Sequence, residues 1–299
     1  MVHGSSLSPE LHGDLVANES NEVTIAESQE CVFKADGIRL YQADCLQFMD
    51  ALAERHPDGV FDMIFADSPY FLSNGGITCQ AGKMVAVDKG AWDKSGGPTA
   101  NHAFSLAWLE RCQRALKPNG TIWVSGTHHV IHSIGFAMQQ IGMKILNSIT
   151  WEKPNPPPNL SCRYFTHSTE TILWAARNNR AKHVFNYREM RKENGDKQMK
   201  TVWKFCAPTR SEKKFGKHPT QKPLVLLERI IRSSTNVGDL VFDPFAGSST
   251  TGVAATRLGR KFEGCELEDE FIKTSKARLQ AALYPGSHKT GSPARANQA

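Results

Sequence analysis

Short apolar runs alternate with stretches of helical spacing along most of this chain. The runs predict strands at residues 38–41, 60–65, 121–124, 145–151, 171–174, 239–242 and 261–265. The spacing predicts helices at residues 46–56, 101–116, 132–141, 226–231 and 269–283, with one more starting near Ser249. Strands that alternate with helices are typical of an α/β fold, in which helices cover both faces of a mostly parallel sheet.

Some segments interrupt this alternation. Residues 1–30 lack periodicity, which predicts a flexible N-terminal segment or a minor edge element, and the polar residues 284–299 predict a disordered tail. The glycine-rich residues 71–100 are too long for an ordinary connection, so we expect a lid, with a disordered insertion as the alternative. Residues 153–215 are broken by prolines and basic, and we interpret them as an insertion with its own role. The rest is predicted to form two halves of one domain, residues 31–152 and 216–283.

The composition argues against several classes of protein. No apolar run approaches the roughly 20 residues that span a bilayer. The polar N-terminus lacks an apolar leader, which predicts a cytoplasmic protein with no membrane association. The seven cysteines are scattered and form no C-x-x-C pair, so we expect reduced thiols and no bound metal.

The net charge of +6 is unevenly distributed along the chain. Residues 177–217 hold 13 Lys and Arg against four acidic residues, a local balance of +9, with aromatic residues among them. A basic run is often only a solvated face, but this concentration with interleaved aromatic rings favours a surface for a polyanion.

A carboxylate, a Ser-Pro step and an aromatic ring follow the predicted strand at residues 60–65, in the order Asp67-Ser68-Pro69-Tyr70. Proline has no N–H and restricts the residue before it, so the carbonyls of this turn are not taken up by a helix. Oxygen acceptors beside a flat apolar face suit a planar ring with an exocyclic amino group. Taken alone, however, these four residues fit an ordinary strand exit better.

A second turn, at residues 243–250, carries the strongest local signal. The strand at 239–242 ends in Asp243-Pro244-Phe245-Ala246-Gly247, which places backbone N–H groups and a glycine at the strand's carboxyl end. Open α/β sheets bind ligands at that end. Glu266 closes the next strand, and an acid about 20 residues past a glycine turn is the arrangement that holds a ribose diol. Together these residues predict a nucleoside site.

The ligand is predicted to carry a short zwitterionic chain rather than a pyrophosphate, because neither G-x-G-x-x-G nor G-x-x-x-x-G-K-[ST] occurs. Glu266 would meet the ribose and the glycine turn would meet the amino acid part. Lys222 lies between prolines and could hold a carboxylate, although a lone lysine is usually solvated. Asp44 could receive an adenine amino group, with a helix N-cap as a strong alternative.

In their order, these motifs resemble the permuted (β-class) amino-methyltransferases of DNA. The motifs that carry the resemblance are Asp67-Ser68-Pro69-Tyr70, then His218-Pro219-Thr220-Gln221-Lys222-Pro223, then Asp243-Pro244-Phe245-Ala246-Gly247. Trp151-Glu152-Lys153-Pro154-Asn155 is similar to that family's W-x-K-x-N element. Within the family, the stretches at 70–76 and 159–167 look like the adenine-N6 enzymes of the HinfI, RsrI and DpnII type. Ser68 departs from the usual proline, but serine keeps the backbone carbonyl.

The resemblance implies a Rossmann-like, S-adenosylmethionine-dependent methyltransferase fold with a mostly parallel seven-stranded sheet. It implies that the Asp67 carboxylate and the Ser68 carbonyl accept hydrogen bonds from the N6 amino group of a flipped adenine, while Tyr70 stacks on the base. Residues 153–215 would be a target-recognition insertion. The implied partners are DNA, expected to be double-stranded, a second copy of the chain in a homodimer, and a cognate restriction endonuclease. The implied setting is the cytoplasm of a bacterium or phage host, in association with the nucleoid.

The resemblance also assigns residues to three sites. The predicted catalytic residues are Asp67, Ser68, Pro69 and Tyr70. The predicted cofactor-binding residues are Asp44, Cys45, Asp67, His218, Thr220, Lys222, Asp243, Pro244, Phe245, Gly247, Ser248, Ser249 and Glu266. The predicted DNA-binding residues are Lys153, Asn155, Arg163, Arg188, Arg191, Lys200 and Lys204.

Other functions remain open at this point. The first is methyl transfer to cytosine-N4 or to RNA, although that cytosine branch usually begins its motif with serine rather than aspartate. The second is a DNA-binding module that has lost catalysis, against which the intact Asp67, Tyr70, Asp243, Gly247 and Glu266 argue. A nucleotide-dependent oxidoreductase is disfavoured because the phosphate-binding glycines are missing.

Overall fold

A computed structural model describes residues 30–73, 77–80, 83–86, 90–216 and 218–285. The predicted flexible segment lies outside these residues apart from Glu30, and so does nearly all of the predicted tail. The helices are α1 (Cys45–Arg55), α2 (Pro98–Ala115), α3 (Ile131–Gln140), α4 (Tyr187–Glu193), α5 (Leu224–Ser234), α6 (Thr250–Arg257) and α7 (Asp269–Leu283), with short 3₁₀ turns η1 (Ala91–Asp93) and η2 (Ser211–Lys213). No helix in the described ranges has the length and hydropathy to cross a bilayer.

One large sheet organises the chain, in the order β1-β2-β11-β10-β3-β6-β8-β7-β9. Its strands are β1 (Glu30–Ala35), β2 (Ile38–Gln42), β3 (Phe61–Ala66), β6 (Leu116–Gly126), β7 (Lys144–Glu152), β8 (Thr169–Ala176), β9 (Val202–Lys204), β10 (Leu240–Asp243) and β11 (Lys261–Glu266). All strands run in one direction except β1 and β8, which pair antiparallel with their neighbours. The sheet is therefore mostly parallel, as predicted.

The seven predicted strands are all present, but the sheet has nine. The two additional strands, β1 and β9, lie at opposite edges of the sheet. β1 is largely exposed and β9 spans only three residues, so neither shows the buried apolar run that marks an inner strand. Edge strands of this kind are hard to predict from apolar patterning.

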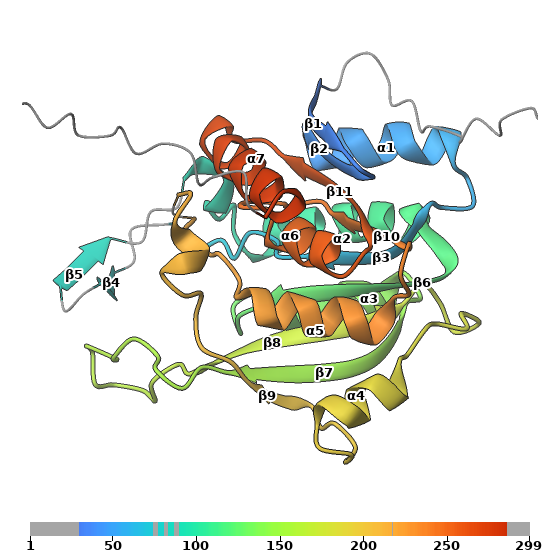
Figure 1. Cartoon of the computed structure of the whole chain (residues 1–299). Coiled ribbons are helices and arrows are strands. Elements are labelled where there is room, and N and C mark those ends of the chain that lie inside the picture. Colours follow the sequence, from blue (N-terminus) through green and yellow to red (C-terminus); the bar gives the residue numbers. More distant parts are fainter. Residues whose placement is uncertain (1–29, 74–76, 81–82, 87–89, 217, 286–299) are drawn as a thin grey trace, which may run out of the picture.

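Helices cover both faces of the sheet (Figure 1). Side chains of β3 alternate between the two faces, with Ile64 and Ala66 in the cluster under α1, α2 and α3. Met63 and Phe65 join the cluster under α5, α6 and α7. A strand buried on both faces is continuously apolar, which explains why β3 was recognisable in the sequence.

The segment at 153–215 is not a unit separate from the sheet. It contains β8, which lies between β6 and β7, and β9, which extends the sheet beyond β7. Its first part, residues 153–168, is a long connection between β7 and β8 that projects from one edge of the sheet (Figure 1). The predicted insertion is therefore partly a piece of the core.

Within the predicted lid at 71–100, the described residues form a separate hairpin of β4 (Ile77–Gln80) and β5 (Lys83–Ala86), followed by η1. The intervening residues 74–76, 81–82 and 87–89 lie outside the described part of the chain. The lid function stays a prediction.

Candidate active site

Acidic side chains gather at the carboxyl ends of the parallel strands. Asp243 and Glu266 are the last residues of β10 and β11, and Asp67 directly follows β3. Asp44 stands between β2 and α1. Because these four strands run parallel and neighbour one another, their carboxyl ends bring the four carboxylates to the same edge.

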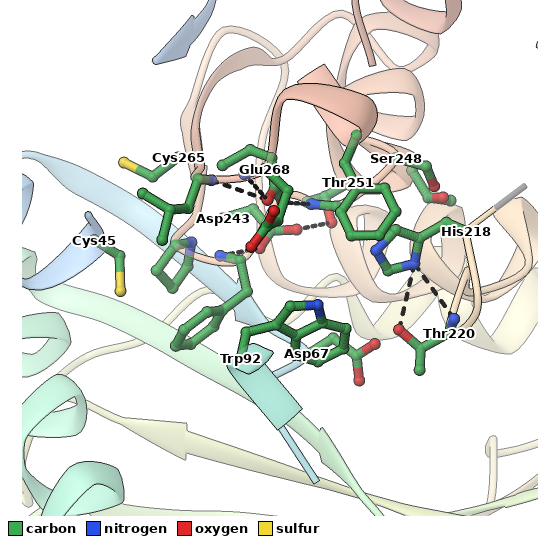
Figure 2. Close-up of a pocket in the computed structure, with 18 of the residues that line it drawn as sticks. Cys45, Asp67, Trp92, His218, Thr220, Asp243, Ser248, Thr251, Cys265 and Glu268 are labelled. Atoms are coloured by element: carbon green, nitrogen blue, oxygen red, sulfur yellow. Dashed lines mark hydrogen bonds between the residues drawn. The ribbon is translucent and has the colours of Figure 1, made fainter. Parts of the chain in front are cut away.

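A pocket opens between these strand ends and the segment that leads into α5 (Figure 2). It is lined by twelve of the thirteen predicted cofactor-binding residues, namely Asp44, Cys45, Asp67, His218, Thr220, Lys222, Asp243, Pro244, Phe245, Gly247, Ser248 and Glu266. Trp92, Thr251 and Glu268 also line it and were not predicted. The fold thus brings these twelve residues to one pocket, and their role in binding a cofactor stays a prediction.

Ser249 is the exception among the predicted cofactor residues. It does not line the pocket, and its fully buried side chain sits on a left-handed backbone with φ of 52°. Its amide donates to the Ala246 carbonyl at 2.7 Å, which closes the turn before α6. Ser249 therefore shapes the turn from behind rather than facing a ligand.

Gly247 is required at its position for two reasons. Its φ of +53° is strained for any residue with a side chain, and a Cβ atom there would lie 2.9 Å from His218 Nε2. The glycine lets the turn approach the imidazole, and both residues line the pocket.

Backbone amides fix the orientation of Glu266 and Asp44. Glu266 accepts hydrogen bonds from the amides of Gly247 at 2.7 Å and of Leu267 and Glu268 at 2.9 Å. Asp44 Oδ1 accepts from the first amides of α1, at 2.9 and 3.0 Å, so it is the N-cap as well as a pocket residue. Burial raises the pKa of Glu266, against the pull of its backbone donors.

Asp243 is a carboxyl group that titrates near neutrality. Its two oxygens accept from Thr251 Oγ1 at 2.6 Å and from the Phe245 amide at 3.0 Å. Burial nevertheless raises the pKa of Asp243 to about 7, with the charges of Asp67 and Glu266 contributing. A cation that enters the pocket would therefore favour the ionised form of Asp243.

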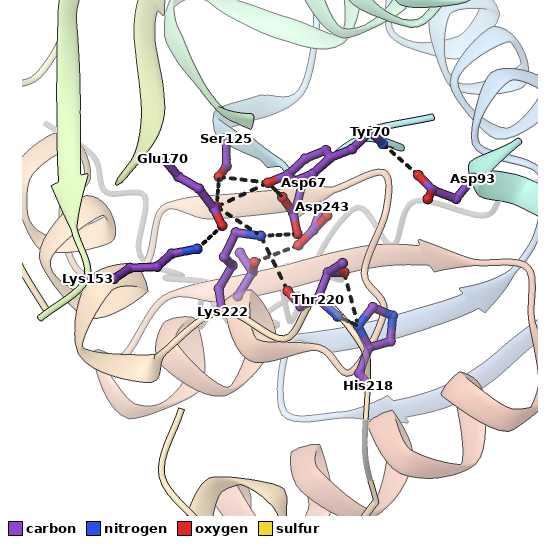
Figure 3. Close-up of polar contacts among 11 residues, drawn as sticks. Asp67, Tyr70, Asp93, Ser125, Lys153, Glu170, His218, Thr220, Lys222 and Asp243 are labelled. Atoms are coloured by element: carbon purple, nitrogen blue, oxygen red, sulfur yellow. Dashed lines mark hydrogen bonds and ion pairs between the residues drawn. The ribbon is translucent and has the colours of Figure 1, made fainter. Parts of the chain in front are cut away.

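The catalytic candidates belong to a buried network (Figure 3). The Tyr70 hydroxyl donates to Asp67 Oδ1 at 2.8 Å and lies 3.2 Å from Glu170 Oε2 and 3.4 Å from Ser125 Oγ. Burial raises the pKa of Tyr70 well above its usual value, so the hydroxyl keeps its proton. Burial also raises the pKa of Asp67, although Lys222 opposes the effect.

Lys222 lines the pocket, but the partners of its ammonium differ from the ligand carboxylate that was predicted. Its ammonium lies 2.5 Å from Asp67 Oδ2 and 3.7 Å from Glu170 Oε2, with the side chain only 6% exposed. Burial opposes the charged form, but the two carboxylates raise the pKa of Lys222. The ammonium is thus committed to carboxylates of the protein itself, and the idea that it holds a ligand carboxylate is not supported.

Glu170 links this network to Lys153, whose ammonium contacts Glu170 Oε1. Burial would raise the pKa of Glu170, but Lys222 and Lys153 outweigh it and hold the pKa at about 2. Lys153, predicted to contact DNA, therefore has a partner within the site. In the described ranges, no three His, Cys, Asp or Glu side chains are grouped to hold a metal ion.

A second pocket adjoins the first across the Asp67–Lys222 pair. Tyr70, Trp151, Lys153, Asn155 and Glu170 line it, and it shares His218, Thr220, Gln221 and Lys222 with the first pocket. The side chain of Tyr70 is 5% exposed, and its hydroxyl is hydrogen-bonded to Asp67. A base that stacks on the Tyr70 ring would therefore lie in this second pocket. Asp67 therefore stands at the junction of two ligand-sized spaces.

Asp93 holds the backbone that follows Pro69 and was not predicted. Its fully buried carboxylate accepts from the amides of Tyr70, Phe71 and Leu72 at 2.8–3.2 Å and from Ser73 Oγ at 2.8 Å. No feature of the glycine-rich sequence around it signals this role. Asp93 takes the place of a helix in satisfying the backbone after Pro69.

The structure brings only some of the predicted DNA-binding residues together. Lys153 and Asn155 line the second pocket, and Arg163 is exposed on the β7–β8 connection. Lys200 is exposed, and Lys204 pairs with Glu152 at 3.1 Å.

Arg188 and Arg191 lie on α4, away from both pockets. α4 packs at the end of α5 remote from Lys222, where the Asn186 amide donates to the Ser233 carbonyl at 2.8 Å (Figure 1). Glu193 on α4 also pairs with Arg229 and Arg232 of α5, at 2.7 and 3.0 Å. The basic segment is therefore divided between the two ends of the sheet.

The family model described as "DNA methylase" (N6_N4_Mtase) matches residues 61–277, which include the whole lining of the second pocket and that of the first apart from residues 43–45. The chain belongs to the DNA methylase family. This DNA methylase is 54% identical over 243 residues to the type II methyltransferase M2.DpnII of Streptococcus pneumoniae, covering 81% of the chain and 89% of the relative. It is 52% identical over 254 residues to M2.LlaDCHI of Lactococcus lactis subsp. cremoris, covering 84% and 93%. The predicted resemblance to the DpnII type is confirmed.

Solved structures confirm the fold of this DNA methylase. The crystal structure of the M1.HpyAVI–SAM complex aligns with a TM-score of 0.61 at 30% identity, over 81% of this chain and 98% of that one. The cytosine-N4-specific PvuII DNA methyltransferase aligns with a TM-score of 0.65 at 19% identity, over 82% and 87%. The predicted Rossmann-like methyltransferase fold is therefore correct.

Proposed function

We propose that this DNA methylase transfers the methyl group of S-adenosylmethionine (SAM) to the N6 amino group of an adenine extruded from DNA. The observation that carries the proposal is the position of Asp67. It lines the first pocket, while its partners Tyr70 and Lys222 line the second. A donor in the first pocket and a base in the second would meet at this carboxylate.

The first pocket suits SAM in shape and charge. Its rim of Asp44, Asp67, Asp243 and Glu266 favours a ligand that carries sulfonium and ammonium cations. Glu266 Oε1 accepts from two amides and Oε2 from one, so Oε2 retains acceptor capacity for a ribose hydroxyl. Gly247 and His218 line this pocket and would flank the amino acid part of the ligand. When bound, SAM supplies an electrophilic methyl group.

The residues around Asp67 prepare the amino group for attack. The exocyclic amine of adenine is a poor nucleophile, because its lone pair is delocalised into the ring. Hydrogen bonds from its two protons to the Asp67 carboxylate and the Ser68 carbonyl would turn the lone pair out of conjugation and stabilise the positive charge that develops on nitrogen. Lys222 and Tyr70 hold the carboxylate in place before the base arrives.

Adenine is favoured over cytosine by the aspartate at the first position of the motif and by the high identity to the DpnII-type relatives. Methyl transfer to cytosine-N4 is the competing activity, since a cytosine-N4-specific enzyme shares the fold. The test is to incubate the protein with DNA and methyl-labelled SAM and to separate the digested nucleosides. Label in N6-methyladenine supports the proposal, and label in N4-methylcytosine would replace it with the competing activity. The preference for duplex DNA, the homodimer and a cognate endonuclease stay predictions.

A further inference from the structure

The connection between β7 and β8 is an ordered loop at the mouth of the second pocket. Its base is closed by a hydrogen bond from the Lys153 amide to the Ser168 carbonyl at 2.7 Å. At its tip, Asn159 Oδ1 accepts from the amide and hydroxyl of Ser161, at 3.0 and 2.7 Å, while its Nδ2 donates to the Tyr164 carbonyl at 2.5 Å. These local bonds hold the tip in one conformation.

The loop presents apolar side chains to solvent. The exposed fractions are 49% for Leu160, 60% for Tyr164 and 96% for Phe165. Tyr164 is anchored, because its ring lies 5.2 Å from that of His167, which stacks at 4.7 Å on His128. At 96% exposure, Phe165 has almost no contact with the other residues that the structure describes. A rigid loop that holds an aromatic ring fully in water gains no folding stability from that ring.

The position of the loop relates Phe165 to the base site. Lys153, Asn155 and Pro157 of the loop line the second pocket, as does Thr127, which directly precedes His128. The Tyr164–His167–His128 stack thus ties the loop tip to the same rim. Residues 153–168 contain no acidic residue, and the exposed Arg163 adds a positive charge, so the loop is suited to a polyanion.

We propose that Phe165 is a wedge that enters the base stack of duplex DNA and fills the space left by the extruded target base. The inference rests on the proposed function, because a wedge has a role only if a base leaves the duplex. Inserted apolar side chains compensate for lost stacking in other proteins that distort DNA. The wedge would lower the cost of extrusion, which is smallest when the target base has no pairing partner.

The test compares Phe165→Ala with the unmodified enzyme on two substrates. One is a duplex that the wild-type enzyme methylates, and the other is the same duplex with an abasic site opposite the target base. Because one stack of a base on an aromatic ring is lost, Phe165→Ala is expected to lower single-turnover methylation of the intact duplex roughly tenfold or more. Its rate on the abasic duplex should stay close to that of wild type, and Phe165→Trp should restore the rate on the intact duplex.

Phe136→Ala is the matched control, since Phe136 is a 56% exposed phenylalanine on α3 that lines neither pocket. It should leave both rates unchanged. In a readout independent of activity, 2-aminopurine at the target position should brighten on binding wild type and less on binding Phe165→Ala. Equal losses on both duplexes would mean an ordinary contact and overturn the wedge, as would full activity on the intact duplex. If wild type methylates no DNA at all, the proposed function fails as well.

Discussion

The Lys222 ammonium lies 2.5 Å from Asp67 Oδ2, in an ion pair whose side chains are 6% and 12% exposed. The pair spans 155 residues of sequence and forms the wall between the two pockets. Because an unpaired charge at this depth is costly, the lysine fixes both the position and the ionised state of the carboxylate.

Replacing Lys222 with methionine should therefore move the pH dependence of catalysis. Without the ammonium, Asp67 faces Glu170 alone, and two neighbouring carboxylates raise each other's pKa. In the proposed mechanism the ionised Asp67 is the active form, so the acidic limb of the pH–rate profile should shift to higher pH. The profile of methyl transfer by Lys222→Met measures this, and the added Glu170→Gln change should move the limb back. An unchanged profile would show that Lys222 does not tune Asp67.

Glu170 should contribute to stability in a defined pH window. Its folded-state pKa is about 2, below the ordinary 4.5, so the unfolded chain binds more protons between these values. The contribution is present above pH 4.5 and is lost as the pH falls towards about 2. Urea unfolding should show a shallower acid loss for Glu170→Gln than for wild type. At neutral pH that variant should be about 3 kcal/mol less stable, because the neutral amide loses the charge interactions of Glu170 with Lys153 and Lys222. Parallel curves for the two proteins would rule out this linkage.

The network around Glu170 also shows where sequence prediction stops. Asp67, Asp243 and Glu266 each follow an apolar run directly, so their place at the sheet edge could be predicted. Glu170 lies near the start of β8, and only because β8 runs antiparallel does that start reach the carboxyl ends of its neighbours. If β8 is predicted to be parallel to its neighbours, such a residue is placed at their amino ends instead.

The positions of the residues in the basic segment could not be predicted from the sequence, for a related reason. Its residues are close in sequence, but α4 packs at the end of α5 remote from Lys222, whereas β9 runs parallel to β7 and brings Lys204 beside Glu152. A count of charges along the sequence gives the net charge of the segment, but it does not show where in the fold each side chain lies. Lys153 and Asn155 were recognised through a local motif, and these two reach the site.

SAM binding should tighten as the pH rises through neutrality. Asp243 has a pKa of about 7 through burial, and a cationic ligand favours its ionised form. Between about pH 6 and about pH 7.5, where SAM keeps its own charges, the affinity should rise by up to about tenfold per pH unit. Calorimetry should also detect proton release on binding. Asp243→Asn should remove the pH dependence, and a flat response in wild type would contradict the assignment.

Gly247→Ala should impair SAM binding beyond its effect on folding. The new Cβ meets His218 Nε2 at 2.9 Å within the pocket, on a backbone with φ of +53°. Gly142 is a matched control, since its φ is +75° but a Cβ there meets nothing within 4 Å. Both alanine variants should lose about 1 kcal/mol of stability from backbone strain. Only Gly247→Ala should raise the Kd for SAM, by roughly tenfold, which corresponds to the loss of one contact with the ligand. Equal Kd values in the two variants would show that Gly247 does not shape the binding site for SAM.

The central claim is that the Asp67 carboxylate polarises the amino group of the target adenine. The direct measurement is single-turnover methyl transfer to adenine in DNA by Asp67→Asn, with SAM affinity measured on the same preparation. Asp196→Asn, at an exposed carboxylate remote from both pockets, is the control and should behave as wild type. We predict that Asp67→Asn transfers methyl groups at least about 100-fold more slowly, since a preorganised acceptor is lost, while its SAM affinity changes only a few-fold. Transfer by Asp67→Asn at the wild-type rate would contradict the claim.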